Sequence, residues 1–149
     1  MRKLAILVPM ALLLAGCAPT VALEPAPEAT STVCAEVSVR LPDTVAGLAK
    51  RLTNAQATGA WGEPASVILH CGVPSPAPTA ELPCITVEGI DWLRDDKDDP
   101  NFIFTTYGRE PAVEVIINGD QASGLEALTD LAPAVGRLPV EGTCVVPGE

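Results

Sequence analysis

The sequence has few aromatic residues and one histidine. Its 149 residues include two tryptophans, one tyrosine, two phenylalanines and a single histidine. The core must therefore be built mainly from valine, leucine, isoleucine and alanine. Each larger apolar side chain stabilises a fold by about 1.5 to 3 kcal/mol when it is buried. A chain of this length and composition can build one modest domain.

Basic residues are scarce as well. Lysine and arginine together number 9 against 19 acidic residues, which gives a formal net charge of -10 at pH 7. An acidic surface is repelled by phosphate backbones and by anionic lipid headgroups. We therefore expect no nucleic-acid ligand, and any membrane attachment must come from something other than surface charge.

Motifs that carry catalysis or bind metal are also missing. The sequence has no GxSxG element and no pair of cysteines spaced as in a zinc site. His70 is the only histidine, and a hydrolase would need it beside a serine or cysteine and an orienting acid. The neighbouring Cys71 is better explained as half of a disulfide. We expect no enzyme activity, no metal and no cofactor.

Four aspartates within residues 95–99 form the one cluster that suggests a hard cation. Several carboxylates on one loop can bind calcium, but this run lacks the glycine and the closing glutamate of an EF-hand. A solvated hairpin tip explains the run better, and weak calcium binding stays open.

The amino terminus carries an export signal. Arg2 and Lys3 precede an apolar run over residues 4–14, which is too short to be a permanent membrane span. The run ends in Leu14-Ala15-Gly16-Cys17, which is similar to the site where bacterial lipoprotein signals are cut and the cysteine is acylated. This pattern predicts a signal peptide over residues 1–16, lipid on Cys17 and a position at the outer face of the cell membrane.

Residues 17–32 are rich in proline and alanine. Pro19, Pro25 and Pro27 block regular structure, which favours a semi-extended spacer. At about 3 Å per residue, the spacer would hold the following domain roughly 40 Å from the membrane. We therefore predict a flexible tether over residues 17–32 and a single globular domain over residues 33–149.

Four cysteines remain for that domain. An even number in an exported domain indicates two disulfides. Three pairings are possible. We favour Cys71 with Cys84, which flank a proline-rich loop, and Cys34 with Cys144, which would join the two ends of the domain.

The hydrophobic periodicity predicts a mixed fold. Alternation indicates a strand over residues 33–41, and apolar steps of three and four indicate a helix over residues 42–52. The remaining pattern predicts five strands, over residues 67–71, 85–88, 90–94, 102–107 and 112–117, and a helix over residues 125–135 that Pro133 kinks or divides. This order indicates a two-layer α+β domain, with a mostly antiparallel sheet and about two helices, stapled by two disulfides.

Glycine, aromatic, charged and proline residues crowd together in residues 61–64, 71–73 and 105–111. In these segments and in the four domain cysteines, the chain resembles the domain of unknown function 3515 (DUF3515) family of actinobacterial exported lipoproteins. The resemblance runs from about Cys34 to Cys144. It implies a location in the cell envelope and no established activity.

Arg109 is the main candidate ligand-binding residue. A guanidinium on a glycine-flanked turn can bind a carboxylate or phosphate with two parallel hydrogen bonds. The alternative is an internal ion pair with Glu63, Glu110 or another acid. Trp61 and Tyr107 would complete a site for a carboxylate, phosphate or glycan, although Trp61 and Trp92 would also suit the core.

Three functional hypotheses follow. The first is a non-catalytic lipoprotein that binds or assembles with an envelope protein or glycan at the outer face of the cytoplasmic membrane. The second is a small-ligand binding module, which requires Arg109 and Trp61 in one pocket. The third is a hydrolase centred on His70, which requires a serine hydroxyl within hydrogen-bond reach of the ring.

Overall fold

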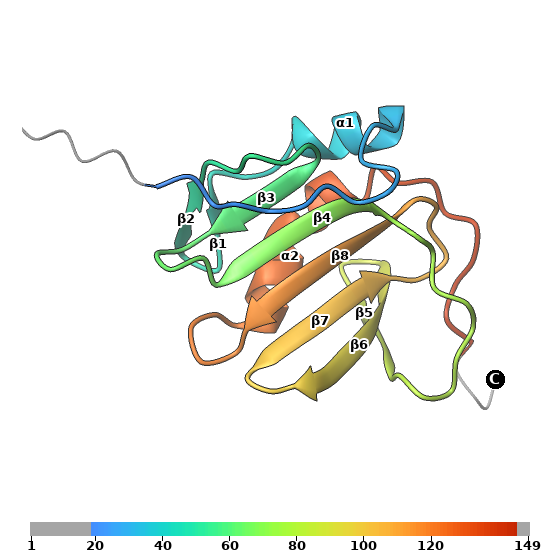
Figure 1. Ribbon diagram of the computed structural model, residues 1–149. Helices are drawn as coiled ribbons and strands as arrows, with labels where there is room; N and C mark the ends of the chain where they lie inside the picture. The colour runs from blue at the N-terminus through green and yellow to red at the C-terminus, as the bar shows by residue number, and fades with distance from the viewer. Residues whose placement is uncertain (1–18, 146–149) are drawn as a thin grey trace, which may run out of the picture.

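The computed structural model describes residues 19–145, which form one antiparallel sheet and two helices (Figure 1). The sheet has eight strands in the order β1-β2-β3-β4-β8-β7-β6-β5. The elements are α1 (Thr32–Ser38), β1 (Thr44–Val45), β2 (Leu48–Arg51), β3 (Thr58–Trp61), β4 (Val67–Val73), β5 (Cys84–Val87), β6 (Ile90–Asp98), β7 (Asn101–Thr106), β8 (Ala112–Asn118) and α2 (Gly124–Val135). The predicted α+β class is confirmed, with a mostly antiparallel sheet, two helices and two disulfides. The predicted signal peptide and Cys17 lie outside the described residues.

Helix α2 covers one face of the sheet. It lies behind β4 and β8 in Figure 1, and it contacts β1 and β5, the two ends of the strand order. The sheet therefore curves around this helix. Leu128, Leu131 and Val135 recur at helical spacing and are fully buried in the core beneath it. Neither helix within residues 19–145 is long and apolar enough to cross a membrane.

The sequence marks both ends of α2, with a capping serine before its first residue and a proline in its last turn. The Ser123 hydroxyl accepts a hydrogen bond from the Glu126 N–H at 3.3 Å, which caps the first turn. Pro133 lies in the last turn and does not divide the helix, which is continuous to Val135. The prediction of a helix over residues 125–135 is confirmed.

The first two elements predicted from periodicity are wrong. The segment predicted as a strand over residues 33–41 contains α1, and the segment predicted as a helix over residues 42–52 is the β1–β2 hairpin. Cys34 and Val37 are both fully buried, and their spacing of three places them on one helix face. The alternation of apolar residues in this segment indicated a strand, but the burial of Cys34 and Val37 against the domain stabilises a helix instead.

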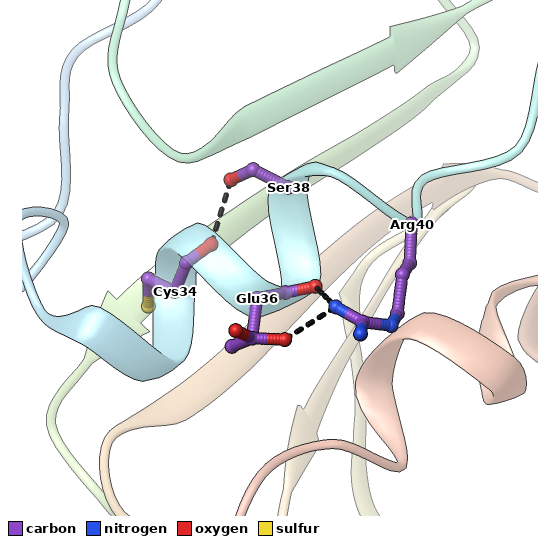
Figure 2. A network of polar contacts seen from close by, with 4 residues as sticks. All are labelled: Cys34, Glu36, Ser38 and Arg40. Atoms are coloured by element: carbon purple, nitrogen blue, oxygen red, sulfur yellow. Dashed lines mark hydrogen bonds and ion pairs between the residues drawn. The ribbon is translucent and has the colours of Figure 1, made fainter.

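Side chains also complete the ends of α1. The Ser31 hydroxyl caps its amino terminus by accepting from the Cys34 N–H at 3.3 Å. Figure 2 shows the Ser38 hydroxyl donating to the Cys34 carbonyl at 2.7 Å, and Arg40 donating to both the carboxylate and the carbonyl of Glu36. The Glu36 carbonyl lies in the last turn, where the helix provides no N–H partner, so the Arg40 guanidinium satisfies it.

The central strands match the predictions more closely. β8 confirms the strand predicted over residues 112–117, and its position between β4 and β7 suits its mostly apolar sequence. β5 and β6 form a hairpin whose turn is made by Glu88 and Gly89, with φ angles of 50° and 73°. A tight turn therefore joins the two strands predicted over residues 85–88 and 90–94.

The disulfides pair Cys34 with Cys71 and Cys84 with Cys144, so the favoured pairing is wrong. Helix α1 contacts β4, and this packing brings the Cα atoms of Cys34 and Cys71 to 5.5 Å. Cys84 begins β5, and three strands separate β5 from β4 in the sheet. The proline-rich segment 74–83 therefore connects distant strands instead of closing a short loop.

The segment predicted as a flexible tether is docked on the domain over residues 19–31. The Val21 N–H donates to the Leu52 carbonyl at 2.8 Å, the Glu28 N–H donates to the Gly72 carbonyl at 2.9 Å, and Ala29 is buried. The tether prediction is wrong here because prolines block regular structure but leave the other residues' N–H and C=O groups free to pair with a neighbouring chain. The domain includes these residues and does not begin at residue 33.

Gly72→Ala should detach this segment. A Cβ atom at Gly72 would lie 2.4 Å from the carbonyl carbon of Glu28, and the φ angle of +102° adds backbone strain. We expect the free energy of unfolding to fall by about 3 kcal/mol. We also expect amide hydrogen exchange at Val21 and Glu28 to become faster.

Gly47→Ala is the matched control. Gly47 has a φ angle of +74°, and a Cβ atom there would have nothing within 4 Å. It should cost only the backbone strain of about 1 kcal/mol and leave exchange at Glu28 unchanged. Equal effects of the two substitutions would contradict the docked arrangement.

Candidate functional site

Arg109 lies in the turn between β7 and β8 and is only 6% exposed. Its Nη1 atom donates to the carbonyl of Leu138, and its own carbonyl accepts a hydrogen bond from the Ser75 hydroxyl. Burial lowers the pKa of the Arg109 guanidinium, while the Asp91 carboxylate acts in the opposite direction. The guanidinium is thus a buried cation bonded to the main chain.

The predicted internal ion pair of Arg109 is not formed. Glu63 pairs instead with Arg51, with 2.7 Å between its Oε2 and Nη1 of Arg51. Among residues 19–145, no carboxylate oxygen lies within 4.0 Å of the Arg109 guanidinium. Arg109 therefore differs from Arg40, Arg51 and Arg94, each of which has an acidic partner.

The turn that contains Arg109 holds the carboxyl-terminal segment. The Gly108 carbonyl accepts from the N–H groups of Glu141 and Gly142 at 2.7 and 3.1 Å. Gly108 has a φ angle of +64°, and a Cβ atom there would lie 2.0 Å from the Gly142 carbonyl oxygen. The glycine is therefore required for this close approach, which leads the chain toward Cys144.

A hollow of about 180 Å³ lies over this turn. We call it the Arg109 hollow; its lining residues are Ser75, Pro76, Tyr107, Gly108, Arg109, Glu110, Glu141 and Gly142. The structure brings two of the predicted ligand-binding residues, Tyr107 and Arg109, together here. Ligand pockets typically measure about 300 Å³ or more, so this hollow fits only a very small ligand.

Trp61 does not take part in the Arg109 hollow. It is fully buried in β3, where its Nε1 donates to the Pro42 carbonyl at 3.0 Å. The strand register aligns Trp61 with Phe102, at the opposite end of β7 from Arg109. Trp92 is fully buried as well, so both tryptophans fill the core and the predicted pocket containing Trp61 and Arg109 is absent from the described residues.

His70 lies on β4, with Thr58 and Glu114 as its cross-strand neighbours. Its Nδ1 is 3.8 Å from Oε1 of Glu114, and the Thr58 hydroxyl is bonded to the Ala55 carbonyl at 2.6 Å. Cys71 is in a disulfide. The register thus provides an acid beside His70 but no serine among these neighbours.

The acidic run forms the tip of the β6–β7 hairpin. Asp96, Asp98 and Asp99 are exposed, and Asp98 accepts a hydrogen bond from the Asn101 side chain at 3.2 Å. Across residues 19–145, no group of three or more histidine, cysteine, aspartate or glutamate side chains is arranged to hold a metal ion. These residues form a solvated tip of the hairpin.

A comparison with known protein families identifies the family of this chain. The model of the DUF3515 family, described as a protein of unknown function, matches residues 4–142. The chain belongs to the DUF3515 family. No curated protein and no solved structure matches it. For this DUF3515 protein, function must therefore be argued from its own side chains.

One site in this DUF3515 protein was missed by the sequence reasoning. An apolar pocket of about 310 Å³ lies between α2 and strands β5, β6 and β7. Its lining residues are Ile85, Val87, Arg94, Phe102, Phe104, Gly124, Leu125 and Leu128. The alternation of Phe102 and Phe104 was a usable signal, because it puts both rings on one face of β7. Nothing local to the sequence indicated that β5 and α2 would meet them.

Arg109→Ala should destabilise the DUF3515 domain at its carboxyl-terminal segment. It removes a charged donor from the buried Leu138 carbonyl, so we expect a loss of about 2 kcal/mol in the free energy of unfolding. Faster proteolysis after residue 138 should accompany the loss.

Arg40→Ala provides the comparison, because it removes an arginine from a solvent-exposed helix pair with Glu36. It should cost about 0.5 kcal/mol or less. If denaturant unfolding gave the same value for both variants, the bonds of Arg109 to the main chain would have no structural importance.

Proposed function

We propose that this DUF3515 protein is an exported lipoprotein that acts as a non-catalytic binding or assembly partner at the outer face of the cytoplasmic membrane. The two disulfides carry the proposal, because such bonds persist in oxidising compartments and are rare in the cytosol. The sequence supports it independently through the export signal and the lipidation pattern that ends at Cys17.

The docked amino-terminal segment refines this proposal. The Pro19 carbonyl accepts from Nη2 of Arg51 at 2.7 Å, and the Arg51 side chain is only 9% exposed. Cys17 precedes Pro19 by two residues, so their Cα atoms are at most about 7 Å apart. A lipid on Cys17 would therefore hold the β2–β3 end of the domain directly at the membrane surface.

Residues around this point suit such a position. Leu52 is 75% exposed, and Lys50, two residues before it, is an exposed basic residue. An apolar side chain beside basic residues can enter the headgroup region while most of the acidic surface stays away from it. On this proposal the domain is held close to the bilayer in one orientation, and partners would meet it there.

The arrangement of reactive side chains favours a binding role over catalysis. Cys34, Cys71, Cys84 and Cys144 are all in disulfides and so cannot act as nucleophiles. The Thr58 hydroxyl donates its proton to the Ala55 carbonyl and not to His70, so the pair is not arranged as a nucleophile and its base.

Cys17→Ala should abolish incorporation of an alkyne-labelled fatty acid when the protein is expressed in a lipoprotein-processing bacterium. The thiol is the acyl acceptor, so removing it removes the label. Ala18→Ser, which leaves Cys17 intact, should keep the label. An unlabelled wild-type protein, or a labelled Cys17→Ala variant, would exclude the lipoprotein proposal.

A photoreactive lipid tests the orientation in the same cells. It should crosslink to residues near Leu52 and not to the tip of the β6–β7 hairpin, which lies toward the other edge of the sheet. Crosslinks at both places would show that the domain is not held in one orientation.

A second candidate function is the binding of a small anion in the Arg109 hollow. The observation that favours it is a buried guanidinium without a carboxylate partner among the described residues, next to Tyr107. Titration with inorganic phosphate should shift the amide resonances of Gly108 and Gly142, and Arg109→Gln should abolish the shifts. If phosphate leaves the wild-type resonances unchanged, the hollow is not an anion site.

A further inference from the structure

The apolar pocket exists because α2 begins with a glycine. Gly124 is the first residue of α2, and a Cβ atom there would lie 3.5 Å from the Phe104 ring. The absence of a side chain at this position leaves room beside the Phe104 ring, which lines the pocket although Phe104 is only 5% exposed. Leu125 follows at 67% exposure and lies at the rim. The volume of about 310 Å³ falls within the range of small-molecule sites.

Most of the pocket wall has no side-chain group that can form a hydrogen bond with water. Six of its eight lining residues have aliphatic or aromatic side chains: Ile85, Val87, Phe102, Phe104, Leu125 and Leu128. Water in such a pocket finds few of the two to four polar partners that hold an ordered molecule. An apolar group would displace this water and gain favourable contacts with the two phenylalanine rings.

Arg94 is the exception among the lining residues. It lies opposite Phe104 in the β6–β7 register, and its guanidinium carbon is 4.9 Å from the centre of the Phe102 ring. Its Nε is buried and has no hydrogen-bond partner among the described residues. Within residues 19–145 its only ion pair is with Asp96, whose Oδ2 is 3.6 Å from Nη2 and whose side chain is 60% exposed.

This geometry leaves Arg94 with unused binding capacity. A buried donor without an acceptor is unfavourable, and a weak contact with an exposed aspartate does not satisfy Nε. A guanidinium can bind a carboxylate with two parallel hydrogen bonds. The stacking of Arg94 on Phe102 holds the guanidinium at the pocket wall, where such a carboxylate would meet it.

We propose that the apolar pocket binds a small amphipathic carboxylate, with its apolar body against Phe102 and Phe104 and its acid group on Arg94. A monoanion fits better than a dianion, because Asp96 offsets part of the Arg94 charge and the protein surface is acidic overall. The proposal goes beyond the anchored binding role and does not depend on lipid at Cys17.

Octanoate is the probe for this proposal, and octanol is its uncharged match in chain length. Titrating octanoate into the mature protein with both disulfides formed should give saturable heat and shift the amide resonances of Ile85 and Gly124. Octanol should bind at the same place about tenfold more weakly, because it lacks the charge that Arg94 recognises.

Two substitutions separate the charged and apolar parts of the site. Arg94→Gln should weaken octanoate about tenfold and leave octanol unchanged. Arg137→Gln makes the same change of charge at an exposed position after α2 and should affect neither ligand. Gly124→Leu should fill the pocket and abolish binding of both octanoate and octanol. The variant should still fold, because leucine favours helix and a Cβ atom at this position makes only ordinary contacts.

Three results would overturn the proposal: no saturable binding of octanoate, equal octanoate affinity in wild type and Arg94→Gln, or shifts confined to the Arg109 hollow. Each can occur whether or not Cys17 is acylated, because the titration measures binding at the pocket and not the lipid on Cys17. Fatty-acid labelling of Cys17 and octanoate binding can therefore succeed or fail independently.

Discussion

The carboxyl end of β4 is the point on which the amino-terminal half of the structure depends. Cys71 joins this end covalently to α1, and the next residue, Gly72, accepts a hydrogen bond from Glu28. The pairing of β4 with β8 also shifts register between Cys71 and Val73. Three separate segments thus meet at two residues, and only glycine at position 72 leaves room for the approaching backbone.

A similar arrangement fastens the other end of the chain. The Gly108 carbonyl and the Arg109 guanidinium hold the segment after α2, and the Cys84–Cys144 disulfide then joins that segment to β5. Each disulfide therefore ties a terminal segment to the sheet, where it adds to the main-chain hydrogen bonds. A domain with so few aromatic residues gains stability from restricting its unfolded chain in this way.

The two arginines at candidate sites differ in what already binds them. Arg109 is used by the fold, because its guanidinium donates to a main-chain carbonyl and its turn holds the carboxyl-terminal segment. Arg94 lies on the wall of an apolar pocket with a buried Nε that has no acceptor in residues 19–145. Arg109, which its flanking glycine made the main candidate, is thus largely structural. Arg94 lies within an ordinary strand and has a donor that no described residue pairs with.

The sequence by itself determined the α+β class, the strands β5, β6 and β8 and the long helix α2, because each of these elements has a sustained hydrophobic pattern. It also indicated two disulfides from four cysteines. Only the tertiary structure decided the form of residues 32–52, the cysteine partners, the docking of residues 19–31 and the separation of Trp61 from Arg109. These features depend on which strands become neighbours across the curved sheet, and local periodicity carries no information about contacts between residues so far apart in the chain.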